Sequence, residues 1–488
     1  MATAATDVRL PTQLVIGGER VDAAAGGRFP VVNPATEEVI AQVAEGTERD
    51  VELAVQSARS TFESDAWRRM SARRRGELLL RLGELCMQHR DELARLETLN
   101  NGKPLFESAI DVKLTAETFR YYGGWADKIH GEVVPVDGPF LNYTLREPLG
   151  VVGAIVPWNF PMSLAAWKVA PALACGNTVV LKPSEQTPFT ALRMAELALE
   201  AGFPAGALNC VPGQGPVAGM ALVRHPSVDK IAFTGSTEVG ALIMREAAGT
   251  VKKLSLELGG KSPNIVYADA DLDAAARGAL TGIFYGKGEV CAAGSRLLVE
   301  ASVAEELTAR IVQRAAKMVA GDPLDPKTRL GALVSKTQME RVLGYIARGR
   351  DEGARVLAGG DRTTVGGRGY FVQPTIFGNV TPAMTIAREE IFGPVLATMT
   401  FEEGESGAVA LANDTIYGLA AGIWTRDIKK ALRTARALRA GTVWINTYNM
   451  YDAASSFGGF KQSGFGRELG MHGLDGYTQV KSVWVDLS

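Results

Sequence analysis

The sequence contains few of the residues that mark disulfide-stapled, metal-binding or membrane-spanning proteins. Its 488 residues include four cysteines, which occur in no CxxC or other metal-ligand spacing, and four scattered histidines. We therefore expect no metal site and a reducing, cytoplasmic location. The longest apolar stretches, such as Val151–Pro157, are too short to cross a bilayer, and the first dozen residues lack the apolar core of a signal peptide.

The sequence also lacks an excess of charge of either sign. Its 52 basic and 54 acidic side chains give a formal net charge of −2, whereas nucleic-acid binders usually carry a basic excess or stripe. The densest basic cluster lies within Arg68–Arg75 and opens a helical pattern, which is typical of a solvated helix face. Neither nucleic acid nor a membrane is expected as a partner.

Apolar residues make up 46% of the chain, enough for large buried cores, and they recur with clear periods. Residues 1–11 are expected to be an unstructured lead-in, and Leu14–Val21 is predicted as a hairpin that turns at Gly17 and Gly18. Helices with one apolar face are predicted in three segments: from Thr47, where Asp50 completes a capping-box pattern; from about Ser71; and through Val112–Tyr122.

From Val151 onward, strand-like and helix-like patterns alternate. Such alternation implies parallel sheet joined by right-handed helical crossovers. The pattern restarts at Arg296, so two α/β units in series are predicted after the helical prelude. Residues 133–147 are extended and mixed in polarity, and resemble an excursion from the body. The predicted strands are Val151–Val156, Thr178–Leu181, Leu208–Val211, Lys230–Phe233, Leu254–Leu258, Asn264–Val266, Arg296–Val299, Val395–Phe401, Ala421–Trp424 and Thr442–Ile445.

Several strand ends carry residues that could hold a dinucleotide. Phe233–Gly240 follows a strand and opens a helix, and a helix N-terminus attracts phosphate; a purely structural turn is the alternative. Gly213-Gln-Gly215 also follows a strand, but flanking prolines favour a plain loop. Lys182 and Glu185 follow another strand, at the end where ligands bind in open α/β sheets, although two such charges are often simply solvated.

Three side chains are candidates for chemistry. Cys291 lies in a glycine-rich turn whose small residues leave it open to approach, whereas the other cysteines have less open surroundings. A buried packing role is the alternative for a lone cysteine. Glu257 ends an apolar run and could activate water, and Asn159 lies in a stiff Pro-Trp-Asn-Phe-Pro frame that suits an oxyanion donor. The alternatives are a solvated glutamate and an asparagine that caps the next helix.

Seven motifs occur in one order along the chain: PWNFP, KPSE, FTGST, ELGGKSP, GEVCAAGSR, EEIFGP and GFKQSGFGRE. Together they resemble the aldehyde dehydrogenase superfamily from about residue 12 to the end. The resemblance implies an α/β fold with two Rossmann-like parallel-sheet domains in series and a small β oligomerisation arm. It implies an NAD-binding domain of residues 1–127 and 149–259, a catalytic domain of residues 260–460, an arm of residues 128–148 and 470–488, and a homotetramer or homodimer.

The resemblance also assigns roles to single residues. It implies that Cys291 attacks the aldehyde carbon, that Asn159 and the Cys291 backbone N–H hold the oxyanion, and that Glu257 activates water to hydrolyse a thioester. Lys168 and Glu468 would complete a proton relay. The substrate tunnel would be lined by Leu114, Trp167, Tyr451 and Phe457. NAD, with NADP as an alternative, would be held by Val156, Trp158, Lys182, Glu185, Gly215, Phe233, Gly235, Ser236, Val239, Leu258, Glu390 and Phe392.

The sequence departs from the family pattern at three positions. Gly286 stands where many members have Asn, Glu289 where many have Gln, and Ser456 where Pro is common. Glu289 could raise the pKa of the Cys291 thiol by like-charge repulsion, or it could point away. These changes bear on the tunnel shape and the rate more than on the reaction class.

The expected reaction is oxidation of an aldehyde to a carboxylic acid. Glu185 should repel a 2′-phosphate, which favours NAD over NADP. The apolar, aromatic tunnel predicts medium aliphatic or aromatic aldehydes, and a betaine or amino aldehyde held by cation–π contact is the alternative. An acyl-CoA product is disfavoured by Glu257. A cysteine hydrolase or amidase would want a histidine partner that no motif supplies, and a non-catalytic binding protein is disfavoured by the candidate catalytic residues.

Overall fold

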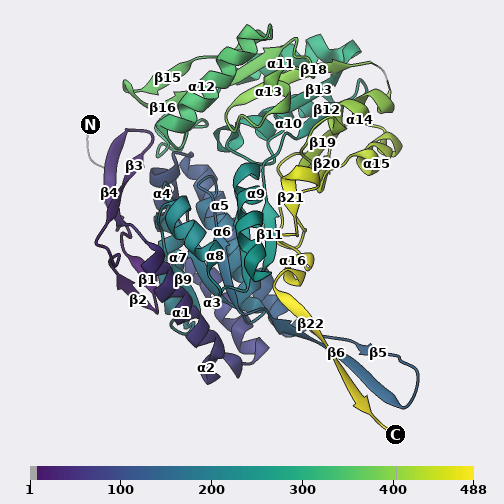
Figure 1. The fold of residues 1–488 in the computed structure, drawn as a ribbon. Helices are drawn as coiled ribbons and strands as arrows, with labels where there is room; N and C mark the ends of the chain where they lie inside the picture. Colours follow the sequence, from purple (N-terminus) through teal and green to yellow (C-terminus); the bar gives the residue numbers. More distant parts are fainter. Residues whose placement is uncertain (1–7, 403) are drawn as a thin grey trace.

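The computed structural model describes residues 8–402 and 404–488. Residues 1–7 of the expected lead-in lie outside this range. Val8 and Leu10, which lie inside it, pack against the largest core cluster, so this part of the prediction is wrong. Figure 1 shows two α/β units and a narrow β arm that carries the C-terminus away from the body. Among the described residues, no helix combines the length and apolarity needed to cross a bilayer.

The first unit is built on an eight-stranded sheet with the order β2-β1-β9-β8-β7-β10-β11-β21. Its five central strands are parallel. The predicted hairpin β1–β2 lies at one edge, and β21 closes the other edge antiparallel to β11. The strands are β1 Leu14–Ile16, β2 Glu19–Val21, β7 Val151–Ile155, β8 Thr178–Lys182, β9 Leu208–Cys210, β10 Lys230–Thr234, β11 Lys253–Glu257 and β21 Gly464–Phe465.

The second unit is built on a seven-stranded sheet with the order β14-β17-β18-β13-β12-β19-β20. All its strands are parallel except β14, at one edge. The chain enters this sheet directly from the first one, because β12 follows β11 without an intervening helix. The strands are β12 Pro263–Val266, β13 Arg296–Glu300, β14 Arg355–Ala358, β17 Thr375–Gly378, β18 Val395–Phe401, β19 Ala420–Trp424 and β20 Thr442–Ile445.

All ten predicted strands are present, with ends within one residue of the predicted ones. Their nearly continuous apolar runs reflect burial on both faces, as expected for parallel strands covered by helices. Within β7, Val152 packs into one core cluster and Val151 into another, because successive side chains point to opposite faces. The sheet of the second unit divides in the same way, with Ile265 and Val266 in separate clusters.

The predicted helices are also confirmed, and the first of them is capped as the sequence indicated. The Thr47 N–H donates to Asp50 Oδ2 at 2.8 Å, and the Ser71 hydroxyl accepts from the Arg74 N–H. The helices are α1 Glu48–Glu63, α2 Asp65–Arg68, α3 Ala72–Gln88, α4 Arg90–Asn101, α5 Leu105–Trp125, α6 Pro161–Ala174, α7 Phe189–Ala201, α8 Met220–Arg224, α9 Thr237–Ala247, α10 Leu272–Phe284, α11 Ala304–Ala315, α12 Lys336–Asp351, α13 Thr385–Arg388, α14 Glu405–Asn413, α15 Ile428–Ala437 and α16 His472–Asp475.

Three smaller β elements complete the fold. The arm is a three-stranded sheet of β5 Val133–Val134, β6 Phe140–Pro148 and β22 Thr478–Asp486, which contains the predicted excursion. Two hairpins, β3 Arg28–Asn33 with β4 Glu38–Ala44 and β15 Arg362–Val365 with β16 Arg368–Val372, were not predicted. They meet each other, because Arg368 pairs with Glu38 at 2.6 Å and the Tyr370 N–H donates to the Pro34 carbonyl. The N-terminal hairpin thereby ties the two units together.

Candidate active site

Most of the predicted cofactor residues lie together where four neighbouring strands of the first sheet end, on the side of their carboxyl ends. This side of the sheet is called the sheet edge below. The chain runs from β7 outward through β8 to β9, and then crosses back to β10 on the other side of β7. Ligands of open α/β sheets bind at such a switch in strand order. Ile155 lies beside Lys182, and Thr234 beside Glu257, in the strand register. Residues from motifs a hundred positions apart therefore share one edge.

Helix α9 offers the phosphate-binding end predicted for this edge. Ser236 is its N-cap, and its hydroxyl accepts from the Val239 N–H at 3.3 Å. Gly235 lets the chain pass Phe233 closely, since a Cβ there would lie 2.4 Å from the ring. The uncompensated N–H groups and the helix dipole favour a negatively charged group at this point. Gly215 opens a single π-helical turn, Gly215–Gly219, that leads into α8, so the prediction of a plain loop there is wrong.

Lys182 and Glu185 lie together at the end of β8. The Lys182 ammonium donates to Glu185 Oε2 at 3.3 Å, and the Lys182 carbonyl accepts from the Val156 N–H at 3.1 Å. Lys182 is buried, and this burial lowers its pKa. Because Glu185 is partly exposed, the pair presents both a donor and an acceptor, which is the pattern needed to hold a sugar with two hydroxyls.

The other end of the candidate cofactor site is formed by Trp158, Glu390 and Phe392. The rings of Trp158 and Phe392 meet edge to face with centroids 5.2 Å apart. Glu390 Oε1 accepts from the Gly260 N–H at 2.9 Å, and burial raises the pKa of Glu390 to about 7. Phe392 has a φ of +62°, a strained value for an aromatic residue, and such strain often accompanies functional sites. The Leu258 side chain packs on Gly240 of α9, between the two ends.

Cys291 lies in the turn that follows a short 3₁₀ segment, Tyr285–Gly288, and it is partly exposed. The other three cysteines are fully enclosed, in line with the packing role predicted for them. The pKa of the Cys291 thiol is raised to about 12. The main cause is that the surrounding protein shields the thiol from water, and the nearby carboxylates of Glu390 and Glu257 add to the effect. The thiolate therefore needs a proton acceptor or a nearby positive charge in order to form.

Glu257 ends β11 inside the protein, and neither of its carboxylate oxygens has a hydrogen-bond partner among the described residues. Burial, and then the Glu468 carboxylate, raise its pKa well above the usual value. Lys168 pairs closely with Glu468 and donates to the Thr234 hydroxyl at 2.6 Å. The three residues of the predicted proton relay, Lys168, Glu257 and Glu468, thus lie together, and the Glu257 carboxylate is free to accept a proton.

Asn159 is buried beside the turn that carries the nucleophile. Its Nδ2 donates one hydrogen bond of 2.9 Å to the Glu289 carbonyl, so one N–H of the amide remains to be used. The Glu289 side chain points away from Cys291, because its carboxylate accepts from the Val334 N–H at 3.0 Å and lies 2.8 Å from the Lys287 ammonium. The structure therefore supports the expectation that Glu289 points away from Cys291, and not the alternative that it raises the pKa of the thiol.

A cavity of about 320 Å³ leads to Cys291 and contains all four predicted tunnel residues. Its walls are mostly apolar and include a cluster of aromatic rings: Phe457 meets Trp167 at 5.5 Å and Tyr451 at 5.7 Å between ring centroids. Sequence reasoning missed several of its residues. Phe160 lies in the motif that indicated Asn159, and the others come from segments with no chemical motif. These further lining residues include Ile110, Thr118, Phe160, Leu164, Tyr285, Tyr448, Met450 and Leu469.

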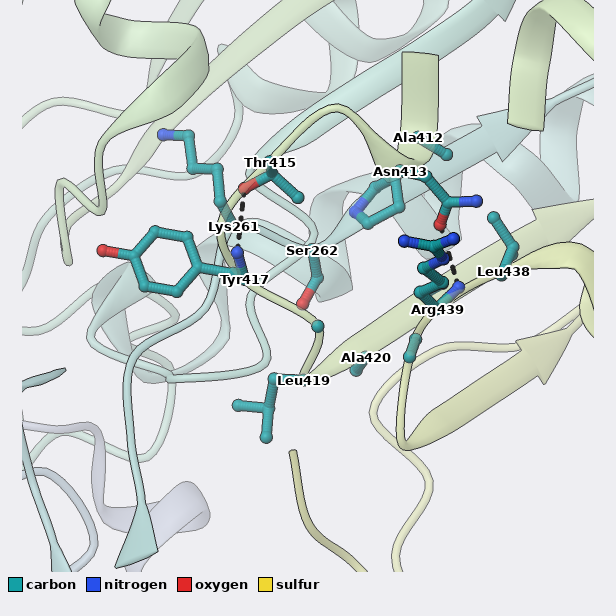
Figure 2. Close-up of a pocket in the computed structure, with 14 residues that line it drawn as sticks. Lys261, Ser262, Ala412, Asn413, Thr415, Tyr417, Leu419, Ala420, Leu438 and Arg439 are labelled. Atoms are coloured by element: carbon teal, nitrogen blue, oxygen red, sulfur yellow. Dashed lines mark hydrogen bonds between the residues drawn. The ribbon is translucent and has the colours of Figure 1, made fainter. Parts of the chain in front are cut away.

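A second, much smaller cavity lies at the start of the second sheet, lined by Lys261, Tyr417 and Arg439 among others. Figure 2 shows that the Lys261 side chain extends away from Ser262 and Arg439, and that the polar backbone there is paired through Thr415 and Asn413. Its volume of about 10 Å³ has room for little more than one water molecule. The aromatic cavity at Cys291 is therefore the candidate active site.

Comparisons with known proteins agree with this geometry. The family model described as "Aldehyde dehydrogenase family" matches residues 21–483. The chain belongs to the aldehyde dehydrogenase family. It is 51% identical to the human mitochondrial aldehyde dehydrogenase, over 97% of this chain and 92% of that one, and 51% identical to the putative aldehyde dehydrogenase DhaS of Bacillus subtilis, over 97% and 96%. Among solved structures, the NAD+ complex of an aldehyde dehydrogenase from Bacillus cereus is 50% identical with a TM-score of 0.97, covering 99% of this chain and 98% of that one.

As an aldehyde dehydrogenase, the protein is an oxidoreductase that oxidises aldehydes with NAD(P). Its fold is that of the family: two α/β units built on largely parallel sheets, with a β arm. Membership of the family fixes the class of reaction, and the residues that carry it in this chain follow from the site geometry.

Proposed function

We propose that Cys291 is the nucleophile, Asn159 the oxyanion donor and Glu257 the base of hydrolytic aldehyde oxidation. The observation that supports this most directly is the combination of a partly exposed thiol that lines the cavity and a buried carboxylate to which no other side chain donates a hydrogen bond among the described residues. A carboxylate left without partners in a protein interior is costly, and such a group usually has a chemical role.

In the first half-reaction, the Cys291 sulfur forms a bond to the aldehyde carbon, and the oxygen becomes an oxyanion. The remaining N–H of Asn159 and the Cys291 backbone N–H would donate to that oxyanion, which would lower the barrier. NAD held by Lys182, Glu185, Ser236 and Glu390 would supply the hydride acceptor for this step, and Cys291 would then carry the acyl group as a thioester. Loss of the thiol proton is aided by Glu257, because burial and the nearby Glu468 raise the pKa of this carboxyl and so make the carboxylate a stronger base.

In the second half-reaction, Glu257 takes a proton from water, which then attacks the thioester carbon and releases the acid and the Cys291 thiol. The Lys168–Glu468 pair next to Glu257 gives that proton a path out of the interior. Gly458 keeps this region open, since a Cβ at that position would lie 2.8 Å from Glu257 Oε1. An acyl-CoA product would not need this base, so its presence favours hydrolysis.

The residues at the sheet edge fit a dinucleotide, with Lys182 and Glu185 at the adenosine ribose, Ser236 at the pyrophosphate and Glu390 at the nicotinamide ribose. We favour NAD over NADP, because the Glu185 carboxylate would repel a 2′-phosphate. The solved structures of relatives include several NAD+ complexes.

The cavity favours medium aliphatic or aromatic aldehydes, because its rings offer apolar contacts over most of the path to Cys291. A structurally solved relative, 48% identical, is an indole-3-acetaldehyde dehydrogenase, which is consistent with an aromatic substrate. A cationic aldehyde is the second candidate: a betaine aldehyde dehydrogenase from Staphylococcus aureus is 41% identical, and aromatic rings can bind a quaternary ammonium group.

We also propose that the β arm mediates assembly into a homodimer or homotetramer. Phe140, Leu141, Val480 and Trp484 are exposed on it, which is typical of a surface that a second copy covers. The four free thiols fit the reducing cytoplasm as the location.

The decisive experiment measures reduced cofactor by absorbance with hexanal, benzaldehyde, phenylacetaldehyde and betaine aldehyde. We expect kcat/KM to be highest for the uncharged aldehydes, no dependence on CoA, and no activity in Cys291→Ala, which should still bind NAD. A preference for betaine aldehyde would reverse the substrate assignment. Activity in Cys291→Ala would remove that residue as the nucleophile.

A further inference from the structure

The turn that carries Cys291 contains an ion pair that the mechanism above does not use. Lys287 and Glu289 have exposed fractions of 2% and 1%, and the Lys287 ammonium lies 2.8 Å from Glu289 Oε2. Lys287 also has a left-handed backbone with a φ of +62°. A buried ion pair does not in general stabilise a fold more than apolar residues would, so its position next to the nucleophile calls for another explanation.

Hydrogen bonds connect Lys287 through Asn101 to Asn159, the candidate oxyanion donor, and from Asn159 back to Glu289. Together they form a closed ring. The Lys287 ammonium donates to the Asn101 carbonyl at 3.0 Å and to Asn101 Oδ1 at 2.7 Å. Asn101 Nδ2 in turn donates to the Trp158 carbonyl at 2.8 Å. The neighbouring Asn159 donates from its own Nδ2 to the Glu289 carbonyl at 2.9 Å, which returns the ring to the turn that holds Lys287.

The ring joins three segments that are far apart in the sequence: the end of helix α4, the loop after β7 and the nucleophile turn. Both Asn101 oxygens accept from one ammonium, so the Asn101 amide can present only its Nδ2 group to the Trp158 carbonyl. That contact fixes the backbone immediately before Asn159. The Glu289 carboxylate balances the charge of Lys287, and its second oxygen is held by the Val334 N–H.

We propose that Lys287 and Asn101 are positioning residues that hold the Asn159 amide at the distance from Cys291 that oxyanion stabilisation requires. This inference rests on the proposed role of Asn159. Stabilisation of a developing charge depends on donors that are already in place, so small displacements of the amide lower the rate of the first half-reaction. Lys287 itself is not among the residues that line the cavity.

The test compares two variants of the full-length enzyme, Lys287→Met/Glu289→Gln and Glu289→Gln. They differ only at position 287. The double exchange removes both charges of the pair, and Glu107, the other buried carboxylate near Lys287, keeps the charge of Lys103 beside it. The rate of the first hydride transfer is measured by stopped flow, at saturating NAD and hexanal, and the Kd of NAD by fluorescence. We expect the double variant to be slower than Glu289→Gln by about tenfold, the effect of one or two lost hydrogen bonds, with a Kd for NAD within about twofold.

The same exchange is then made in an Asn159→Ala background. If Lys287 acts through Asn159, it should now change the rate by less than about twofold, because coupled residues are not additive. An equal loss in both backgrounds, or no loss in either, overturns the inference. A normal rate in Asn159→Ala alone would instead overturn the proposed oxyanion role. If the double variant does not bind NAD, Asn101→Ala replaces it in the cycle and is judged by the same criteria.

Discussion

The exchange Glu257→Gln separates the two half-reactions, because glutamine keeps the shape of the side chain and removes its ability to accept a proton. Glu257 is 4% exposed, and neither of its oxygens is hydrogen-bonded within the described residues. The amide therefore breaks no hydrogen bond, and it also removes the repulsion from Glu468 that contributes to the raised pKa. We expect the variant to fold with at least the thermal stability of the wild type.

The size of the kinetic effect follows from the role of a general base, which typically contributes a factor of about 10² to 10⁴. A loss of about 10³ in kcat corresponds to roughly 4 kcal/mol in the barrier to thioester hydrolysis. The first hydride transfer should be slowed much less. One equivalent of reduced cofactor per active site should therefore appear in a burst, followed by a slow steady state.

Stopped-flow absorbance with hexanal and excess NAD measures the burst and the steady state together, and Cys291→Ala is the matched control without either. Only the deprotonated form of Glu257 accepts a proton, so the wild-type kcat should fall when acid protonates this carboxylate. Because the pKa of Glu257 is raised, this fall should occur at a higher pH than it would for an ordinary carboxyl. In Glu257→Gln this pH dependence should disappear. A fully active variant, or one without a burst, would falsify the assignment of Glu257.

Three further predictions concern the cofactor, the tunnel and the arm. Glu185→Gln should raise kcat/KM for NADP by about tenfold through loss of charge repulsion, as read from steady-state rates with each cofactor; an unchanged NAD-to-NADP ratio would remove Glu185 from the ribose site. Phe457→Ala should lower kcat/KM for hexanal by about tenfold or more and lower the Tm, because Phe457 is 4% exposed and packs on two aromatic rings; wild-type kinetics would place the substrate elsewhere. Trp484→Glu should shift the mass found by light scattering toward the monomer, since Trp484 is 59% exposed beside Phe140; an unaltered oligomer would exclude this face of the arm.

The strands were predictable from the sequence because parallel strands buried on both faces have short, almost purely apolar runs. The two hairpins β3–β4 and β15–β16 were not, since their strands are short, mix polar with apolar residues and bury part of their surface against distant segments. Pairing of β21 with β11 was also missed, because a two-residue strand gives no pattern of its own.

The residues of the candidate site were also predictable only in part. In the structure, Cys291 lines one cavity with the four residues that the family resemblance assigned to the tunnel, and Glu257 lies near the Cys291 thiol. The sequence indicated Cys291 and Glu257 because chemistry restricts the residue types that can serve. The direction of the Glu289 side chain could not be predicted, since it depends on Val334, which lies 45 residues later in the chain. Lys287 gave only a weak signal, as one charged residue in a glycine-rich turn, and its partner Asn101 comes from a different helix.

The pairing of β21 with β11 has a consequence for the order in which the enzyme is made. Gly464 lies beside Glu257, and the Ser463 hydroxyl and carbonyl bond to Gly259 and Leu258, so the base is enclosed by residues synthesised some two hundred positions later. Chains emerge from the ribosome N-terminus first and fold as they appear. A nascent chain that has already exposed Cys291 therefore still lacks the wall around Glu257, and we expect turnover only after the segment that contains Ser463 and Gly464 has left the ribosome.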